Sequence, residues 1–364
     1  MDSWHNARMT PAAADLIAQF DEFIRRDPAR RGLISSEPQF GPLCPGHLAA
    51  AAAHLAEHGK HVAIVTGFYI PKGDPPAAET DGPLGSALLA AALHAAGMKV
   101  ELITDELCSN AVRVAAWESG LNERCMHVVK MGAAADFARE FGAQIGNELT
   151  HLIAIERVGP SHTEQSLRRQ SRTGDPPSDR FASLVPLEHQ DHCHNMRGEI
   201  IDGYTADLHL LFESLPNFRF SVGTSFRDAV LCERRGDGPT IGIGDGGNEI
   251  GMGCVPWEDL ERRLSGEQSG RVPCCVATDW NIVAGVSNWG AYALAAATLL
   301  LRGQQLLLAP FDTAQQQRAL EHLVAHGPAV DGVTRRREPT VDGLPFLTYI
   351  QPWQGMRRLL GLPD

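Results

Sequence analysis

Several familiar functional signatures are missing from this 364-residue sequence. Its longest apolar candidate, residues 291–301, is shorter than the roughly 18 residues that cross a bilayer, so no membrane partner is expected. The eight cysteines include no Cys-x-x-Cys pair, which argues against a zinc ribbon or a dithiol redox motif and favours reduced thiols. The Gly-x-Ser-x-Gly elbow of hydrolases and the Walker phosphate loop are also absent.

The N-terminal region lacks an apolar secretory core, and acidic residues interrupt its arginines, which argues against a transit peptide. We therefore expect a cytoplasmic protein. The formal charge of -12 disfavours a nucleic-acid surface. Assembly into a homo-oligomer is left open by the sequence.

What is present is an ordinary globular composition, 43% hydrophobic and 21% charged, in which short apolar runs alternate with helical patterns. The chain length suggests two or three domains or one large α/β unit. Strands are expected at residues 61–66, 99–104, 126–131, 151–156, 240–244 and 272–278. Helices are expected near residues 10–24, 45–58, 84–96, 106–119, 133–141, 204–216 and 287–301, the first capped by Thr10 and the last by Ser287.

This alternation predicts an α/β fold with a mostly parallel sheet flanked by helices, Rossmann-like and doubly wound. An irregular insertion is expected near residues 158–200. We divide the chain into an N-terminal helical segment that packs on the core (1–60), a catalytic α/β domain (61–350) and a C-terminal tail (351–364).

The most unusual stretch runs from Thr240 to Gly253 and is called here the glycine block. It starts as a buried strand and then combines closely spaced glycines with Asp245, Asn248 and Glu249. Such glycine density suits a tight turn or the close approach of a ligand. The carboxylates suit a metal or an ammonium group, and the backbone N–H groups suit an anion. An acidic residue fits poorly beside a pyrophosphate, so a dinucleotide site is disfavoured; a plain strand-to-loop turn is the alternative.

Two other polar regions allow alternative interpretations. His192 and His194 could ligate zinc, but a solvated loop cluster is favoured because no second ligand pair accompanies them. Arg197 could clamp a carboxylate or be an exposed surface arginine. Residues 331–334 and 340–345 are interpreted as turns, with a hairpin or docking loop favoured over a functional role.

If the sheet is parallel, the polar segments that follow its strands meet at one edge. These segments are residues 67–83, 156–160, 245–253 and 279–290. The side chains expected to converge are Glu79, Asp81, Glu156, Arg157, Asp245, Asn248, Glu249, Asp279 and Asn288. Carboxylates so close together must pair with cations, hold a metal or have raised pKa values, which suits acid–base work on a zwitterionic substrate.

Several motifs together resemble the D-glutamate cyclase family. They are Thr66-Gly67-Phe68-Tyr69-Ile70-Pro71, Glu79-Thr80-Asp81-Gly82-Pro83, Ile155-Glu156-Arg157, Asn195-Met196-Arg197-Gly198, the glycine block from Gly242, Gly285-Val286-Ser287-Asn288-Trp289-Gly290 and Thr340-Val341-Asp342-Gly343-Leu344-Pro345. The resemblance extends from the Arg30-Arg31-Gly32-Leu33 neighbourhood to about residue 345, with a more histidine-rich stretch at 161–194 as a departure.

The resemblance implies a hydro-lyase that converts D-glutamate, an acidic amino acid, to 5-oxo-D-proline and water. That chemistry needs a base for the ammonium, a group that polarises the γ-carboxylate, and a cationic anchor. Catalytic candidates are Asp81, Glu156, Asp245 and Glu249. Candidate substrate-binding residues are Glu79, Thr80, Arg157, Arg197, Gly246, Gly247, Asn248 and Asn288. No cofactor is certain; a divalent metal, Mg²⁺ or Mn²⁺, remains an option with Asp245 as ligand.

Three rival functions share this interpretation of the fold. One is a different lyase or ligase for a small amino or hydroxy acid on the same scaffold. Another is a non-catalytic sensor that binds an acidic metabolite or a metal. A nicotinamide-dependent oxidoreductase is the weakest of the three.

Overall fold

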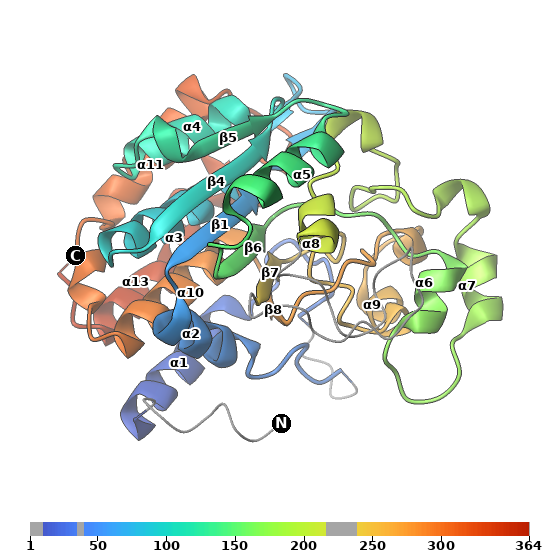
Figure 1. Ribbon diagram of the computed structural model, residues 1–364, viewed down its shortest axis with the longest axis horizontal. Helices are drawn as coiled ribbons and strands as arrows, with labels where there is room; N and C mark the ends of the chain where they lie inside the picture. Colours follow the sequence, from blue (N-terminus) through green and yellow to red (C-terminus); the bar gives the residue numbers. More distant parts are fainter. Residues whose placement is uncertain (1–9, 35–39, 216–238, 364) are drawn as a thin grey trace.

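The fold is built on a parallel sheet with the strand order β5-β4-β1-β6-β7-β8 (Figure 1). The computed structural model describes residues 10–34, 40–215 and 239–363. The strands are β1 (His61–Thr66), β4 (Lys99–Asp105), β5 (Met126–Val129), β6 (His151–Ile155), β7 (Thr240–Gly244) and β8 (Trp280–Val283). Numbered in order of occurrence they stand 3-2-1-4-5-6, the order of Rossmann folds. The predicted parallel, doubly wound α/β class is confirmed.

Both faces of the sheet are covered, because successive side chains of a strand point to opposite sides. On β1, Val62 and Ile64 join one core, whereas Ala63 and Val65 join the other. The first core is completed by α1 (Pro11–Ile24), α2 (His47–His58), α3 (Pro83–Ala95), α4 (Ser109–Glu118), α10 (Ser287–Leu301), α11 (Thr313–His326) and α13 (Gln351–Leu359). The second is completed by α5 (Ala134–Ile145), α8 (Leu210–Ser214) and apolar residues between positions 250 and 276.

The remaining elements are short. The helices are α6 (Glu164–Arg169), α7 (Ser178–Leu184), α9 (Trp257–Arg263) and α12 (Phe346–Tyr349), and the 3-10 helices are Glu123–Cys125, Leu187–His189, Asp202–Tyr204, Ser269–Arg271 and Gln305–Leu308. The strand pairs β2 (Tyr69–Ile70) with β3 (Ala77–Ala78) and β9 (Thr340–Val341) with β10 (Leu344–Pro345) are antiparallel. Helices α6 and α7 belong to the irregular insertion and lie at the end of the molecule farthest from β4 and β5 (Figure 1).

Most predicted elements are present, with boundaries shifted by a few residues. Thr10 caps α1 by accepting a hydrogen bond from Ala13 N. The predicted helix at 204–216 is shorter in the structure, where α8 occupies Leu210–Ser214. Residue 216, the last of the predicted helix, lies outside the described residues. Residues 340–345 form the hairpin that was favoured. No helix of the described residues is long and apolar enough to cross a membrane.

One predicted strand is wrong. Residues 272–278 are apolar and buried as a strand would be, but they make only isolated bridges with loops, such as Ser161 with Cys274. The sheet strand in this region is β8, which starts at Trp280. The prediction was right about the burial and the apolar character of this segment, but the sequence does not show which groups its backbone hydrogen-bonds to.

The second correction concerns the start of α10. Ser287 is the first residue of this helix rather than its cap, and its hydroxyl donates to Glu156. The N–H groups at this helix start are instead accepted by Asp81, which lies 206 positions away in the sequence.

The N-terminal segment packs closely on the loop before α10, and this contact can be tested. Gly285 N donates to Ile24 O, and a Cβ atom at Gly285 would lie 1.4 Å from Arg26 O. We expect Gly285→Ala to lower the free energy of unfolding by about 1–3 kcal/mol or more, because the backbone must shift. Urea denaturation measures this. Gly203→Ala, with no atom within 4 Å of its Cβ, is the matched control; equal stability of the two variants would contradict the packing.

Candidate active site

The site lies where the strand order reverses, between β1 and β6. In doubly wound sheets, ligands bind at the carboxyl ends of the strands beside such a reversal. The loops that follow β1, β6, β7 and β8 all reach this edge. The loops after β1, β6 and β7, together with the turn of the β9–β10 hairpin, supply the acid cluster, defined here as Glu79, Asp81, Glu156, Asp245, Glu249 and Asp342, all of which are buried.

Within the glycine block, Glu249 folds back onto its own loop. Its Oε1 accepts hydrogen bonds from Asp245 N (3.2 Å) and Gly246 N (2.6 Å), and its Oε2 accepts one from Gly247 N (2.7 Å). A Cβ at Gly244 would lie 2.8 Å from the Glu249 carboxyl group, so glycine there leaves room for this side chain. The N–H groups expected to bind an anion therefore bind the carboxylate of Glu249.

Asp81 joins the starts of two helices. Its carboxylate accepts hydrogen bonds from Ser287 N and Asn288 N, both at 2.8 Å, which are the first N–H groups of α10. Asn288 in turn accepts from Gly82 N (3.0 Å) and Gly85 N (2.6 Å) at the start of α3 and donates to Thr80 O (3.3 Å). The positive ends of both helices therefore face the acid cluster.

Glu156 occupies a strained position at the end of β6, with a φ of 45°. Its Oε2 accepts from Ser287 Oγ at 2.6 Å, and a Cβ at Gly82 would lie 2.8 Å from its Cβ. Burial, followed by the charges of Glu79 and Glu249, raises the pKa of Glu156 well above its usual range. A left-handed non-glycine residue held this firmly is typical of functional sites.

Glu79 adds a further carboxyl group with a raised pKa. Burial is the main cause, followed by the charges of Asp342 and Asp81, while a hydrogen bond with Glu156 lowers this pKa. Its Oε1 is buried and finds no partner among the described residues. An unpaired buried oxygen of this kind indicates a place for a proton or a cation.

Arg31 lies against the cluster and was not predicted as a site residue. Its Nη1 donates to Asp245 Oδ2 (2.7 Å) and Asp342 Oδ2 (2.9 Å), and its Nη2 donates to Asp342 Oδ1 (2.7 Å). Burial alone would lower the pKa of Arg31, but Asp245 and Asp342 raise it well above its ordinary value. Asp342 lies in the turn of the β9–β10 hairpin with a φ of 53°.

Asp245 is the centre of the acid cluster. Carboxylate oxygens of Asp81, Asp245 and Asp342 lie within 4.8 Å of one another, and so do those of Glu156, Asp245 and Glu249. Burial raises the pKa of Asp245 well above its usual range; Arg31 opposes this, and the neighbouring carboxylates reinforce it. Its Oδ1 is buried without a partner among the described residues. The arrangement can hold protons or a divalent cation, and it can exchange a proton with a ligand.

A family model described as D-glutamate cyclase-like, C-terminal, matches residues 20–173 and 162–356. The chain belongs to this family. Every residue of the acid cluster, and also Arg31, lies within the two segments that the family model matches.

A curated relative is the human protein named "D-glutamate cyclase, mitochondrial", which is 29% identical over 366 residues. The alignment covers 95% of this chain but 52% of the human protein, so the chain spans about half the length of that relative. The name of the human protein places that protein in mitochondria, so the cytoplasmic location expected for this chain stays a prediction.

Some residues predicted from the sequence lie elsewhere. Arg157 is fully buried and donates to Asp105 Oδ2 (2.6 Å), Gly67 O (2.9 Å) and Ala206 O (2.5 Å), so its guanidinium faces the ends of β1 and β4 and the segment before α8. Arg197 is exposed. Asn248 is buried and donates to His194 O, and Thr80 donates to Thr340 O.

Asp279 lies at the opposite edge of the sheet. Its carboxylate accepts from Thr240 N (2.8 Å), at the start of β7. Because β8 follows Asp279 instead of preceding it, this residue is at the amino end of its strand. Its predicted convergence with the acids is therefore wrong.

The histidines of the insertion form contacts of their own. His194 Nε2 lies 3.0 Å from His189 Nδ1, and His192 pairs with Asp202 through a 2.5 Å contact. The groups of metal-ligand atoms found in the described residues contain neither His192 nor His194. The prediction of a solvated loop cluster is met only in part, because His194 is buried while His192 is half-buried.

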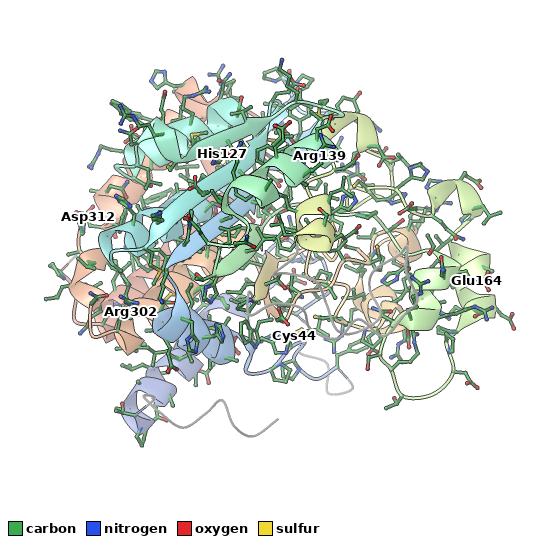
Figure 2. All side chains as sticks on the ribbon, viewed as in Figure 1. Cys44, His127, Arg139, Glu164, Arg302 and Asp312 are labelled. Atoms are coloured by element: carbon green, nitrogen blue, oxygen red, sulfur yellow. The ribbon has the colours of Figure 1, made fainter. Side chains whose placement is uncertain are left out.

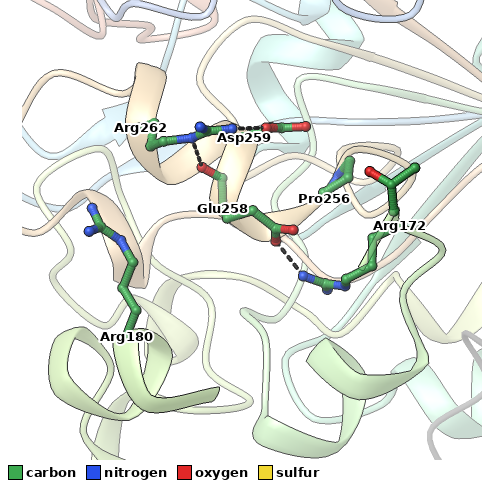
Figure 3. A pocket seen from close by; sticks show the side chains of 7 residues that line it. Arg172, Arg180, Pro256, Glu258, Asp259 and Arg262 are labelled. Carbon is green, nitrogen blue, oxygen red and sulfur yellow. Dashed lines mark hydrogen bonds and ion pairs between the residues drawn. The ribbon is translucent and has the colours of Figure 1, made fainter. Parts of the chain in front are cut away.

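A separate hollow of about 390 Å³ opens between the insertion and α9 (Figure 3). It shares no lining residue with the acid cluster. Its arginines are already paired, Arg172 with Glu258, Arg262 with Asp259 and Arg180 with Glu261. The hollow is therefore not an unoccupied anion site.

The titration of Asp81 gives a test of the electrostatics. Burial and Asp342 raise the pKa of Asp81 from 3.8 to about 7, against the lowering by the backbone N–H groups of Asn288 and Ser287. Between pH 4 and 7 the folded protein keeps this proton while the unfolded chain loses it, so stability falls as pH rises and the loss is complete above pH 7. The contribution is on the order of 4 kcal/mol.

We expect the free energy of unfolding of the wild type, minus that of Asp81→Asn, to decrease by this amount between pH 4 and 8. Urea denaturation at several pH values measures the difference. A difference that is flat with pH would show that Asp81 does not carry a raised pKa in the folded protein.

Proposed function

We propose that the acid cluster removes water from D-glutamate to give 5-oxo-D-proline. The observation that carries the proposal is Asp245, whose Oδ1 is buried and unpartnered at the centre of two groups of carboxylates beside Arg31. Membership of the D-glutamate cyclase-like family supports the choice of substrate. The partner is then a small acidic amino acid.

Asp245 is proposed as the base that takes a proton from the α-ammonium group. The ammonium must become a neutral amine before its nitrogen can attack the γ-carboxyl carbon and close the ring. The ion pair with Arg31 favours the ionised form of Asp245, which a base must have at the start, and the burial that raises its pKa strengthens its affinity for the incoming proton. The oxygen without a partner is the one available to do so.

Arg31 is proposed as the anchor of the substrate's α-carboxylate, in place of Arg157 or Arg197. A guanidinium has five N–H donors, and three bonds to Asp245 and Asp342 account for part of them. The remaining donors suit a carboxylate. Arg157 is engaged by Asp105 and two carbonyl oxygens.

The hydroxide that leaves the γ-carboxyl group must receive a proton. Asp81 and Glu156 both have raised pKa values and therefore hold a proton at neutral pH more readily than ordinary carboxylates. Asp81 is proposed as this acid, with Glu156 and Glu79 as a buried pair next to it. Glu249 is proposed to shape the loop that presents Asp245, because its own oxygens accept three N–H groups.

A divalent cation fits the residues present. The donors are carboxylate oxygens, which suit hard cations such as Mg²⁺ and Mn²⁺, and both Asp245 Oδ1 and Glu79 Oε1 lack a partner among the described residues. Asp81, Asp245 and Asp342, or Glu156, Asp245 and Glu249, would hold it. When bound, it would polarise a carboxyl oxygen of the substrate.

Proton NMR of D-glutamate with the protein tests the function. We expect signals of 5-oxoproline to replace those of D-glutamate, and we expect L-glutamate to stay unchanged. The rate is measured with chelator, without chelator, and with added Mg²⁺ or Mn²⁺. Turnover of a different small amino or hydroxy acid would favour another lyase on this scaffold. Binding of D-glutamate without turnover would favour a sensor.

The role of Asp245 is tested by Asp245→Asn. We expect turnover to fall at least about a hundredfold, the low end for an acid–base group. Asp136→Asn, an exposed change in α5, is the control and should retain full activity. Circular dichroism checks folding, and unchanged turnover in the folded variant would reject the role.

The role of Arg31 is tested by Arg31→Lys, which keeps the positive charge and loses the planar fork. We expect KM for D-glutamate to rise at least about tenfold, because a lysine cannot reproduce bidentate recognition of a carboxylate. Arg197→Lys is the matched control and should leave KM unchanged. A raised KM for Arg197→Lys together with an unchanged KM for Arg31→Lys would indicate that Arg197 binds the α-carboxylate instead.

A further inference from the structure

Two thiols that are far apart in the sequence lie together beside the C-terminal end of the glycine block. Cys44 Sγ is 3.7 Å from Cys254 Sγ, across 210 positions. Cys44 precedes α2 and is labelled in Figure 2, and Cys254 directly follows Gly253 of the glycine block. Both are half-buried, whereas Cys108, Cys193, Cys274 and Cys275 are buried.

We propose that Cys44 and Cys254 form a reversible disulfide that locks the N-terminal segment onto the loop beyond the glycine block. The two sulfurs must approach to about 2.0 Å. Cys44 is in a loop whose neighbours Pro42, Pro45 and Gly46 are exposed, so this loop has room for the adjustment.

The protonation of the pair suits thiol oxidation. A hydrogen bond from Cys254 is the main cause that lowers the pKa of Cys44, assisted by the charge of Arg25, while burial opposes the shift. The same contact raises the pKa of Cys254. One sulfur is thus biased towards the nucleophilic thiolate, and the other keeps its proton until it resolves the intermediate.

The oxidant is a hydroperoxide. The Cys44 thiolate attacks one peroxide oxygen and becomes a sulfenic acid, which breaks the O–O bond and releases water after proton uptake. Cys254 then attacks the oxidised sulfur, and the second oxygen leaves as water. Two thiols and one hydrogen peroxide give one disulfide and two waters.

A metal site at the same place is disfavoured by the surroundings. The groups of three ligand atoms found in the described residues include neither Cys44 nor Cys254. The nearby His47 accepts a hydrogen bond from Asn281 N at its Nδ1. The pair therefore has each other as the main chemical partner.

The bond would reinforce a contact that already positions Arg31. Ser265 donates to Arg31 O and Arg30 O, and Arg263 donates to Leu33 O and Gly41 O. A Cβ at Gly32 would lie 1.9 Å from Arg263 O, so the two segments are in close contact. A covalent link from Cys44 to Cys254 closes a loop around this contact and fixes it.

The test treats the full chain with hydrogen peroxide and maps disulfides by mass spectrometry of non-reduced peptides. We expect a peptide pair linked through Cys44 and Cys254, loss of two free thiols per chain, and reversal by dithiothreitol. Oxidation should also raise the midpoint of thermal unfolding by on the order of 5 °C, because the cross-link constrains the unfolded chain.

The variants Cys44→Ser and Cys254→Ser should lose both the cross-link and the rise in the midpoint. Two control variants should retain both. They are Cys125→Ser, a change at another half-buried thiol, and Cys232→Ser, a change outside the described residues. Links to Cys232 or Cys125, oxidation to sulfinic acid without a link, or an unchanged thiol count in the wild type would overturn the proposal. A link without any rise in the midpoint would overturn the locking role.

Discussion

Like charges buried at short distance repel one another, and the acid cluster brings carboxyl groups together at the carboxyl edge of the sheet. Three kinds of partner compensate for this in the structure. Backbone N–H groups hold Glu249 and Asp81, the guanidinium of Arg31 holds Asp245 and Asp342, and the raised pKa values of Glu79 and Glu156 favour their neutral, protonated forms. The N–H groups of the first kind come from the glycine block, which binds Glu249, and from the start of α10, which binds Asp81.

The carboxylate oxygens of the acid cluster differ in whether they have a hydrogen-bond partner. Carboxylates whose oxygens are already bonded by N–H groups are fixed in place, whereas Asp245 Oδ1 and Glu79 Oε1 are left without partners. Burial makes these oxygens costly to leave unmatched. A ligand that brings a proton, an ammonium group or a cation is therefore favoured at the same point where the proposed reaction needs one.

Much of the fold could be predicted from the sequence because it depends on local patterns. Short buried runs followed by polar loops identified most strands and the edge at which their ends meet, and thereby the neighbourhood of Asp81, Glu156, Asp245 and Asn288. The strand at 272–278 failed because an apolar run that bonds to loops resembles one that bonds to a strand. That error also misplaced Asp279.

Arg31 and Asp342 were missed for a different reason. Their contact joins residues 311 positions apart, and no periodicity or spacing in the sequence reports such a pairing. The motif around Asp342 was noted, but a turn sequence of this type is common without function. Only the arrangement in space shows that the Asp of this turn reaches a guanidinium from the opposite part of the chain.

The pairing of Arg31 with Asp342 affects the order in which the protein can be completed during synthesis. The sheet and the glycine block are made before residue 342 leaves the ribosome, so Arg31 must wait for one of its two acidic partners while the nascent chain already folds. Charge balance at the sheet edge is reached only late in translation. A chain stalled before the hairpin would carry a nearly finished scaffold around an incomplete centre.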